Sequence, residues 1–422
     1  MITIRSDVLK DHSASKNIFT SIPKPIFFLG IALMLMRCAE SFFVPILPLY
    51  VRLLDASIPL FVIGLVTSIN RLGTVFMTPI TGSWCDRIGY GKPFLIGVFV
   101  TSGACILGGI SSSSIDLGLY RLLSGMGYGM VTIATMAFTN KVTTSENRGT
   151  AMSLISASIL AGAAIGPLPG GYIAQSFNTL VLGYRATFLI GGFIELLVGV
   201  YTFFFITKQA RNGMNNVPGP FQKPLFNKMI LRNKGVSVTA LGSFLFGLAH
   251  GAFLYFTVPL WADRLGFQPF AIGWIISAFG VGHVLGALFF GPLSDKTRRR
   301  KSFIFMGFFG PGVVILLFTL LHSISLMVLS TFIIGVVTSP CCGIVPALIA
   351  ESAPETPAAA MGMAKSAEQL GLFVGPIIGG VLIPGLGFKS AMVLYAVITI
   401  VGSLIFMSVV SEPVLLKAES ND

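Results

Sequence analysis

GAAIGPLPGG (Gly162–Gly171) and GLFVGPIIGG (Gly371–Gly380) share the pattern G-x-x-x-G-P-x-x-G-G and lie 209 residues apart. Each segment lies in an apolar run long enough to form a helix, although glycine and proline both weaken a helix interior. Small residues spaced four apart let two membrane helices approach closely, so this composition is typical of tightly packed spans. Its repetition predicts a duplicated helical fold.

The composition of the whole chain indicates a membrane protein. Of its 422 residues, 54% are hydrophobic and 10% are charged, and the mean hydropathy is +0.86. An average soluble domain is about 25% charged. The apolar runs are continuous, about 20 residues long and without strand-like alternation, which predicts membrane-spanning helices. We expect twelve spans, near residues 26–50, 60–82, 93–113, 117–139, 150–174, 186–207, 238–261, 269–292, 302–321, 324–349, 359–383 and 389–410.

The offset of 209 residues recurs outside the two opening segments. GSWCDRIGYGK (82–92) corresponds to GPLSDKTRRRK (291–301) at this offset, whereas PLY (48–50) corresponds to PLW (259–261) two residues out of phase. Because each half holds an even number of spans, we expect parallel repeats about an axis along the membrane normal. The predicted fold class is an all-α membrane protein of two six-helix bundles. The expected domains are a cytoplasmic tail (1–25), the first bundle (26–207), a cytoplasmic linker (208–237), the second bundle (238–411) and a second cytoplasmic tail (412–422).

Lysine and arginine are distributed unequally between the expected loops. The segments on the side of the N-terminus hold 20 of them and the segments on the other side hold 4. This bias predicts that both termini are cytoplasmic, because positively charged loops stay on that side. We therefore expect a multi-pass protein of the cell membrane, which is the inner membrane in a prokaryote. The basic segment KTRRRK (296–301) fits the same topology signal, so we expect no nucleic acid partner.

The sequence holds no motif for a nucleotide, a metal or catalysis. It has no G-x-x-x-x-G-K-[ST] segment, and its five cysteines form no C-x-x-C pair. Two lone histidines in different spans, His250 and His283, do not make a metal site. We expect no enzymatic activity, no cofactor, no metal and no direct use of ATP.

The chain resembles the major facilitator superfamily over nearly its whole length. The strongest mark is residues 82–92, which are similar to the family's G-x-L-a-D-R-x-G-r-k signature between spans two and three. The matching residues are Gly82, Asp86, Arg87 and Gly89, with Lys92 one place late. The second copy retains Gly291 and Asp295 but lacks the second glycine.

The 82–92 segment is predicted to act as a gate. Gly82 permits close helix contact, and Asp86 at the cytoplasmic membrane edge can face a helix N-terminus or a basic side chain. Such a contact would form when the cytoplasmic side is closed and break when that side opens. Alternatively, the segment is a solvated loop that only sets the topology.

The two glycine-proline segments are predicted to place spans five and eleven at the interface between the halves. Their prolines each remove one backbone hydrogen bond and are expected to bend the helix. Generic helix packing explains the spacing equally well. The span-five pattern also resembles a motif of the family's drug/proton antiporters, where the resemblance implies a role in sealing against leak. The residues concerned are Gly162, Gly166, Pro167, Gly170, Gly171, Gly375 and Pro376.

Ionisable residues at membrane depth are costly and therefore candidates for function. Arg121 opens RLLSGMGYG, which is similar to the family's span-four signature R-x-x-x-G-x-G, and the resemblance implies a role in proton coupling. The equivalent position of the second half is Ser330, so this charge departs from the repeat. The alternative is a structural role, either reaching the membrane surface or pairing with Asp116.

Glu40 lies three residues after Arg37, on nearly the same helix face. Burial opposes ionisation of a carboxyl group and a nearby cation favours it, and this competition suits a proton carrier. The alternative is an ion pair between Arg37 and Glu40 that only stabilises span one.

Further candidates lie in other spans. Glu195 is isolated in span six and is expected either to face the cavity or to pair with another span. In span eleven, Glu368 is expected either to pair with Lys365 or to face the substrate. His250 can titrate near neutral pH, and Arg71 is expected at a helix contact. Some aromatic residues are expected to line a cavity for amphipathic or aromatic substrates, for example Phe42, Phe43, Tyr128, Phe253 and Tyr255.

These features predict a transporter that works by alternating access. The first hypothesis is proton-driven export of small amphipathic compounds, with Glu40 and Arg121 as the coupling pair and the proton gradient as the energy source. The second is a proton symporter or a carrier of an anionic metabolite, which the cations inside the membrane favour. A receptor or a lipid flippase is the third. The expected partners are a small-molecule substrate, protons and the lipid bilayer, and we expect a monomer.

Overall fold

The structure is a computed structural model that describes residues 22–144, 147–211, 234–297, 299–341, 344–345, 348–349 and 357–410. Within these ranges every regular element is a helix, which confirms the predicted all-α fold. The first half contains α1 (Lys24–Ser41), α2 (Leu47–Leu54), α3 (Leu60–Ile88), α4 (Gly91–Gly109), α5 (Ser114–Val142), α6 (Arg148–Ile165), α7 (Pro167–Gln175) and α8 (Leu180–Arg211). The second contains α10 (Lys234–His250), the π-helix η2 (Gly251–Thr257), α11 (Val258–Arg264), α12 (Pro269–Thr297), α13 (Arg300–Phe318), α14 (Ile324–Thr338) and α16 (Pro357–Val409).

The described helices account for the twelve expected spans. Nine helical segments are long and apolar enough to cross a membrane, and one of them, α16, is two helices joined at Gly387. The charged α1, continued by α2, and the shorter α14 supply the other two. The expected span ten (324–349) is a continuous helix only to Thr338. Most of both tails and of the linker, like parts of residues 342–356, lies outside the described residues.

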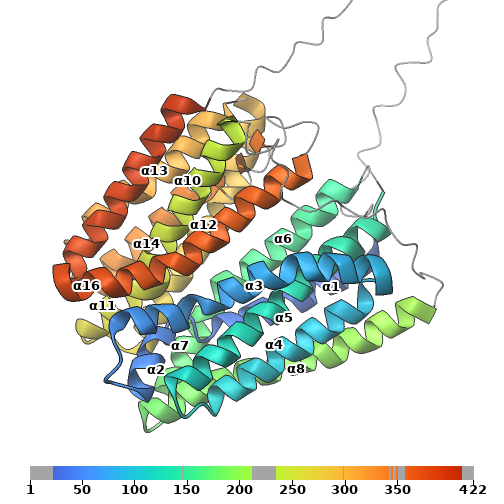
Figure 1. Cartoon of the computed structure of the whole chain (residues 1–422), viewed down its shortest axis with the longest axis horizontal. Coiled ribbons are helices and arrows are strands. Elements are labelled where there is room, and N and C mark those ends of the chain that lie inside the picture. The colour runs from blue at the N-terminus through green and yellow to red at the C-terminus, as the bar shows by residue number, and fades with distance from the viewer. Residues whose placement is uncertain are drawn as a thin grey trace, which may run out of the picture.

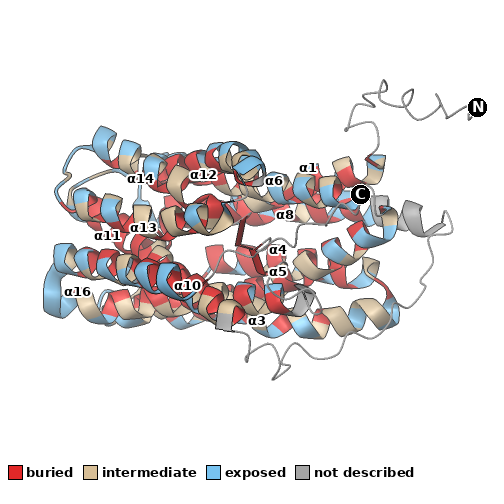
Figure 2. Ribbon diagram, turned by 90° about the horizontal axis from the view of Figure 1, so that it is seen from above, coloured by how far each residue is buried: buried red, intermediate tan, exposed pale blue. Residues whose placement is uncertain are grey.

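The outside of the molecule is apolar. Figure 2 shows exposed residues along the outer faces of the helices and buried residues along the faces that meet. Large apolar side chains such as Leu288 and Phe289 are 68% and 64% exposed. Such a surface would be unfavourable in water but matches lipid, so the bilayer is the solvent of this face.

The two halves form two bundles that lie side by side (Figure 1). At one end, called the α2 end, α2 contacts α11 across the two bundles. At the other, called the terminal end, α1 begins and α16 ends, and the helices of the two bundles diverge. The bundles therefore pack against each other at one end of the molecule and separate at the other.

Pseudo-symmetric glycine contacts join the two halves. A Cβ atom at Gly171 would overlap the carbonyl oxygen of Pro269, and the equivalent Gly380 stands in the same way against Leu60. One turn deeper, Gly273 lies against the Pro167 carbonyl and its counterpart Gly64 against the Pro376 carbonyl (residues 64 and 273 are 209 apart, as are 167 and 376). The two motif helices, α6–α7 and the first part of α16, thus each contact the second span of the opposite half.

The same helices also pack closely on the first span of their own half. Gly162 and Gly166 lie against the carbonyls of Met34 and Cys38, and the equivalent Gly371 and Gly375 lie against those of Phe244 and Leu248. The offset between these α1 and α10 positions is 210 residues, since 244 minus 34 and 248 minus 38 both give 210. Beyond them the offset between PLY and PLW is 211, since 259 minus 48 is 211.

The π-helix η2 explains this last change of offset. A π-helical turn holds one residue more than an α-helical turn, and η2 lies between Leu248 and Pro259. In the first half, α1 ends at Ser41 and α2 begins at Leu47 after a series of turns. One residue of the two-residue mismatch in the sequence therefore reflects the different breaks in spans one and seven.

The backbone keeps helical angles next to the motif prolines. Gly166, which precedes Pro167, has helical backbone angles (φ −56°, ψ −42°). Along α16 the one residue with non-helical angles is Gly387, not a neighbour of Pro376. These prolines interrupt the hydrogen-bond series while close packing on both sides keeps the helical path.

Candidate functional site

An ion pair lies in the first span. The Arg37 guanidinium donates to the Glu40 carboxylate, and their side chains are 16% and 5% exposed. The same guanidinium lies 5.0 Å from the centre of the Tyr128 ring on α5. The structure thus shows the ion pair that the i, i+3 spacing allowed. Glu40 is therefore not an isolated carboxyl group.

Arg121 on α5 is buried and unpaired. It is 6% exposed, and its guanidinium lies 4.7 Å from the centre of the Phe43 ring. Its Nε and Nη1 atoms have no hydrogen-bond partner among the described residues. Asp116, the alternative partner, instead accepts a hydrogen bond of 3.0 Å from Ser112. A structural Arg121–Asp116 pair is therefore not formed.

Glu195 on α8 belongs to the same cluster. It is 0% exposed, and within the described part of the chain neither carboxyl oxygen has a hydrogen-bond partner. The charges of Glu40, Arg37 and Arg121 act on it electrostatically. The expectation that Glu195 faces the cavity or pairs with another span is therefore wrong for this state. Packing of α8 against α1 and α4 holds the residue inside the first bundle.

The aromatic residues near this cluster divide into two groups. Phe43 stacks on Phe188 with ring centres 4.4 Å apart, and Phe42, Phe43 and Phe253 are all buried in the bundle cores. The expectation that these three line a cavity is wrong, because core packing covers them. Tyr128 and Tyr255 are half-buried and face Arg37 and Arg71.

Arg71 on α3 bridges the two halves. Its Nη1 atom donates to Gln369 Oε1 on α16 over 3.5 Å, and its guanidinium lies 5.8 Å from the centre of the Tyr255 ring. The equivalent residue of the second half is Gly280 (71 plus 209), which packs directly on Ala164. One seam between the halves thus holds the bulky cation Arg71, whereas at the equivalent point of the other seam Gly280 allows close contact.

Glu368 and His250 lie in the second half, apart from the buried cluster. Glu368 pairs with Lys365 at 2.8 and 3.0 Å, as the alternative prediction stated, and the Lys365 side chain is 61% exposed. The His250 ring lies among Phe246, Tyr255 and Phe279, with ring centres 5.5, 5.2 and 4.7 Å away. No group of three metal-ligating side chains occurs among the described residues.

A pocket of about 480 Å³ lies against Arg37. Its lining comes from α1, α5 and α6 and combines apolar side chains, hydroxyl groups and one cation. Among the residues that line it are Met36, Arg37, Tyr128, Thr132, Thr135 and Met152. An apolar wall with few polar groups suits an amphipathic molecule.

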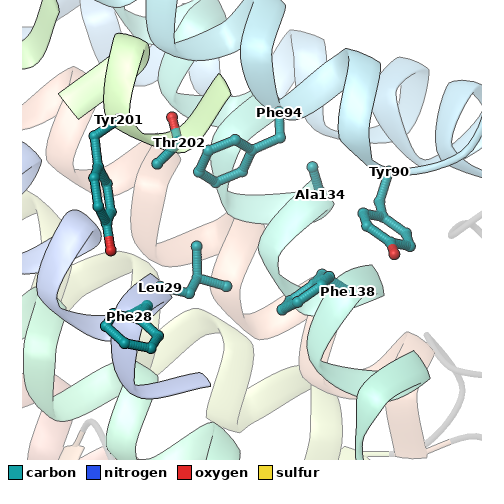
Figure 3. A pocket seen from close by; sticks show the side chains of 8 residues that line it. All are labelled: Phe28, Leu29, Tyr90, Phe94, Ala134, Phe138, Tyr201 and Thr202. Atoms are coloured by element: carbon teal, nitrogen blue, oxygen red, sulfur yellow. The ribbon is translucent and has the colours of Figure 1, made fainter. Parts of the chain in front are cut away.

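A second pocket, of about 360 Å³, lies inside the first bundle near the terminal end (Figure 3). No charged residue lines it, and burial raises the pKa of the Tyr90 phenol at its edge above the ordinary value. Its lining residues are Phe28, Leu29, Tyr90, Phe94, Ala134, Phe138, Tyr201 and Thr202. All of them belong to the first half, as do the residues that line the pocket against Arg37.

The 82–92 segment lies at the terminal end, where the bundles diverge. A Cβ atom at Gly82 or at Gly291 would meet nothing within 4 Å, so the expected close contact is absent in this state. Asp86 lies in the last turn of α3 with Arg87 and forms no ion pair or hydrogen bond with the described residues. Lys92 is exposed in the first turn of α4. The Asp295 side chain lies outside the described residues.

Gly89 ends α3 in a conformation that favours glycine. Its backbone has φ 78° and ψ 166°, which a residue with a Cβ atom adopts only with strain. The corresponding position 298 of the second copy is Arg298, which is not described. The match of Gly89 to the signature thus has a backbone reason that is independent of the resemblance.

Comparison with protein families gives two matches along the chain. The family model described as Major Facilitator Superfamily matches residues 29–271 and also residues 239–421. The second match covers the second half of the chain, as expected for a duplicated fold.

Two bacterial relatives match most of the chain. Multidrug resistance protein 2 of Bacillus subtilis (strain 168) is 25% identical over 380 residues, which cover 88% of this chain and 90% of that protein. The multi-drug resistance efflux pump PmrA of Streptococcus pneumoniae serotype 4 is 26% identical over 396 residues, which cover 90% of this chain and 94% of that protein.

A solved structure has a similar fold. It is a bacterial homologue of the human lysosomal transporter Spinster in an inward-facing and unoccupied conformation. It superposes with a TM-score of 0.75 at 16% sequence identity and covers 94% of this chain and 98% of that one. At this identity the likeness supports the fold alone.

Proposed function

The chain belongs to the Major Facilitator Superfamily, and we propose that it exports small amphipathic compounds in exchange for protons. The relatives named as multidrug resistance and efflux proteins support export of this substrate class. A proton gradient is the energy source, and the transporter needs no cofactor. It acts as a monomer in the cell membrane, with both termini in the cytoplasm.

One observation carries the proposal of proton coupling. A carboxylate, Glu40, lies at membrane depth in contact with Arg37, and Arg37 also lines the pocket between α1, α5 and α6. The charge of Arg121 acts on Glu40 as well. A substrate that enters this pocket changes the surroundings of Arg37, and hence the balance between the ionised and protonated forms of Glu40.

Alternating access follows from the arrangement of the halves. They pack together at the α2 end and diverge at the terminal end, which the positive-inside bias assigns to the cytoplasm. The described state is therefore open to the cytoplasm. In the opposite state, Gly82 and Asp86 would meet the other half and close the cytoplasmic side.

Everted membrane vesicles test the coupling. Addition of an amphipathic fluorescent dye to vesicles with an acidic, positive interior should release protons to the medium and decrease the pH difference. Glu40→Gln should abolish dye-dependent proton release, because an amide cannot exchange a proton, while the protein remains in the membrane. Glu368→Gln is the matched control and should retain release, because Glu368 pairs with a largely exposed lysine. Full proton release by Glu40→Gln would contradict the role of Glu40.

A specific observation supports a second candidate function. The Arg71 guanidinium faces the neutral amide of Gln369 and no carboxylate among the described residues, so it is suited to bind an anionic group. The alternative is a symporter or carrier of an anionic metabolite. In that case organic acids, and not dyes, would change the pH of vesicles, and solute and proton would move in the same direction.

A further inference from the structure

Two buried ionisable groups of the first bundle have no partner in the described structure. Both carboxyl oxygens of Glu195 and two guanidinium nitrogens of Arg121 make no hydrogen bond, although their side chains are fully or nearly fully buried. Buried polar atoms are rarely left unpaired, and such cases require an explanation. An ionised carboxylate without a partner is far more costly than a neutral carboxyl group.

The surroundings of Glu195 contain three further charges. Glu40 and Arg37 act on it from α1, and Arg121 acts on it from α5. On α4, the Cys105 thiol is close enough to interact with Glu195 but donates its hydrogen bond to the Phe188 carbonyl, at 3.3 Å. With both carboxyl groups ionised, the two acids balance the two arginines. With Glu195 protonated, the cluster carries one net positive charge.

We propose that Glu195 is a second proton-binding residue, which holds a proton in the described state and pairs with Arg121 after the proton has left. The O–H bond of the Glu195 carboxyl breaks, the proton leaves the bundle to water, and the Arg121 guanidinium compensates the new negative charge. Arg121 now lies against the Phe43 ring with two N–H groups available. The proposal rests on the proposed proton-coupled transport.

The repeat shows that this proton site belongs to one half. The equivalents of Glu195 and Arg121 in the second half are Leu404 and Ser330, each 209 residues further on. The equivalent of Glu40 at the offset of 210 in this span is His250. Rocking of rigid halves does not change distances inside a half. Protonation of Glu195 must therefore act within the first bundle. When Glu195 is protonated, Arg121 is free to act on the Arg37–Glu40 pair, and when Glu195 is ionised, it draws Arg121 away from that pair.

Infrared spectroscopy of the purified full-length protein in lipid tests the proposal directly. The carbonyl stretch of a protonated carboxyl group should be present in the wild type at neutral pH and disappear when the pH is raised. Glu195→Gln should remove this band, whereas Glu40→Gln and Glu368→Gln should retain it. An unchanged band in Glu195→Gln would overturn the proposal, as would its loss in Glu40→Gln alone.

A measurement on the wild type covers the case that Glu195→Gln does not fold. Dicyclohexylcarbodiimide reacts with protonated carboxyl groups in membranes. Mass spectrometry should find its adduct on the peptide that contains Glu195 and not on the peptide that contains Glu40. Absence of the adduct from Glu195 contradicts a bound proton there.

A transport measurement distinguishes this inference from the proposed function. Glu195→Gln should release one proton fewer per substrate than the wild type, while exchange of labelled for unlabelled substrate continues. The same number of released protons in both would overturn the inference. If the wild type releases no proton on addition of any substrate, the proposed export fails, whereas the infrared result still decides whether Glu195 holds a proton.

Discussion

Single side chains determine where charge lies in this membrane protein. Arg37 and Glu40 neutralise each other within one helix, whereas Arg71 and Arg121 have no carboxylate partner among the described residues. A charged residue at the centre of a span costs about 2.5–3.5 kcal/mol on insertion scales. Arg71 and Arg121 carry this cost without forming ion pairs within the described structure. We infer a role in transport for both, because a neutral side chain would be sufficient for helix packing alone.

Arg121→Gln should decrease substrate-dependent proton release by about tenfold or more, equivalent to about 1.4 kcal/mol. The reason is that Arg121 acts on both Glu40 and Glu195, and the other cation of the cluster, Arg37, is already paired with Glu40. Ser330→Ala, at the equivalent position of the second half, is the control and should change the rate little. Proton release in everted vesicles measures both variants. A decrease of similar size in the control would show that the position, and not the charge, matters.

Gly89→Ala should lower the free energy of unfolding by about 1–3 kcal/mol, because the backbone angles of Gly89 lie in a region that almost only glycine adopts. Gly103→Ala, inside α4 where a Cβ atom meets nothing within 4 Å, is the matched control. That variant should leave stability unchanged or raise it by up to about 1 kcal/mol. Thermal unfolding of the purified variants measures the difference, and equal midpoints would contradict the strain argument.

At the scale of elements, the motif helices are shared between two contacts. The helix formed by α6 and α7 packs on α1 with Gly162 and Gly166, and on α12 with Gly171. The first part of α16 repeats this arrangement on α10 and α3. A helix with small residues on two faces can slide or tilt between two partners, which suits the boundary of two moving halves.

Gly171→Leu should destabilise the described state, because the new side chain meets the Pro269 backbone of the other half. Overpacking of this kind costs about 1–3 kcal/mol. Gly385→Leu, on α16 where a Cβ atom meets nothing within 4 Å, is the control and should unfold at the wild-type temperature. Thermal unfolding in detergent measures both. A wild-type midpoint for Gly171→Leu would indicate that this contact is not closed.

At the scale of the whole molecule, α3 and α16 run antiparallel along one seam. Leu60 with Gly380, Gly64 with Pro376 and Arg71 with Gln369 form successive contacts, and the two residue numbers of each pair sum to 440. Continuation of this register toward the terminal end pairs Thr78 with Gly362. In the described state the seam is closed at Leu60, and the bundles diverge toward the terminal end.

Paired cysteines report whether the terminal end of this seam is closed, in a variant whose five natural cysteines are replaced. Thr78→Cys with Gly362→Cys should cross-link only when the terminal end closes, and an outward-directed proton gradient should change the yield. Gel mobility after oxidation measures the cross-linked fraction. An equal fraction under all conditions would contradict alternating access.

Much of the fold is predictable from the sequence, but less of the site is. Glu40 and Arg37 are three residues apart, so their pairing was one of two outcomes visible in advance. The sequence does not indicate which residues surround Glu195, because its neighbours Glu40 and Arg121 are on other helices. The sequence shows the PLW match shifted by two residues, but it does not indicate that one of the two lies in a π-helix at Gly251–Thr257.

The sequence by itself determined that this protein is a duplicated bundle of membrane helices. The length of its apolar runs allows no other regular structure in a bilayer, and the repeated motif marks the halves. Only the tertiary structure decided that Glu195 joins Glu40 and Arg121 and that Arg71 faces Gln369. It also decided that Phe42 and Phe43 are covered. The physical reason is that hydropathy sets which segments are helices, whereas the face that each helix turns inward depends on packing against partners distant in the chain.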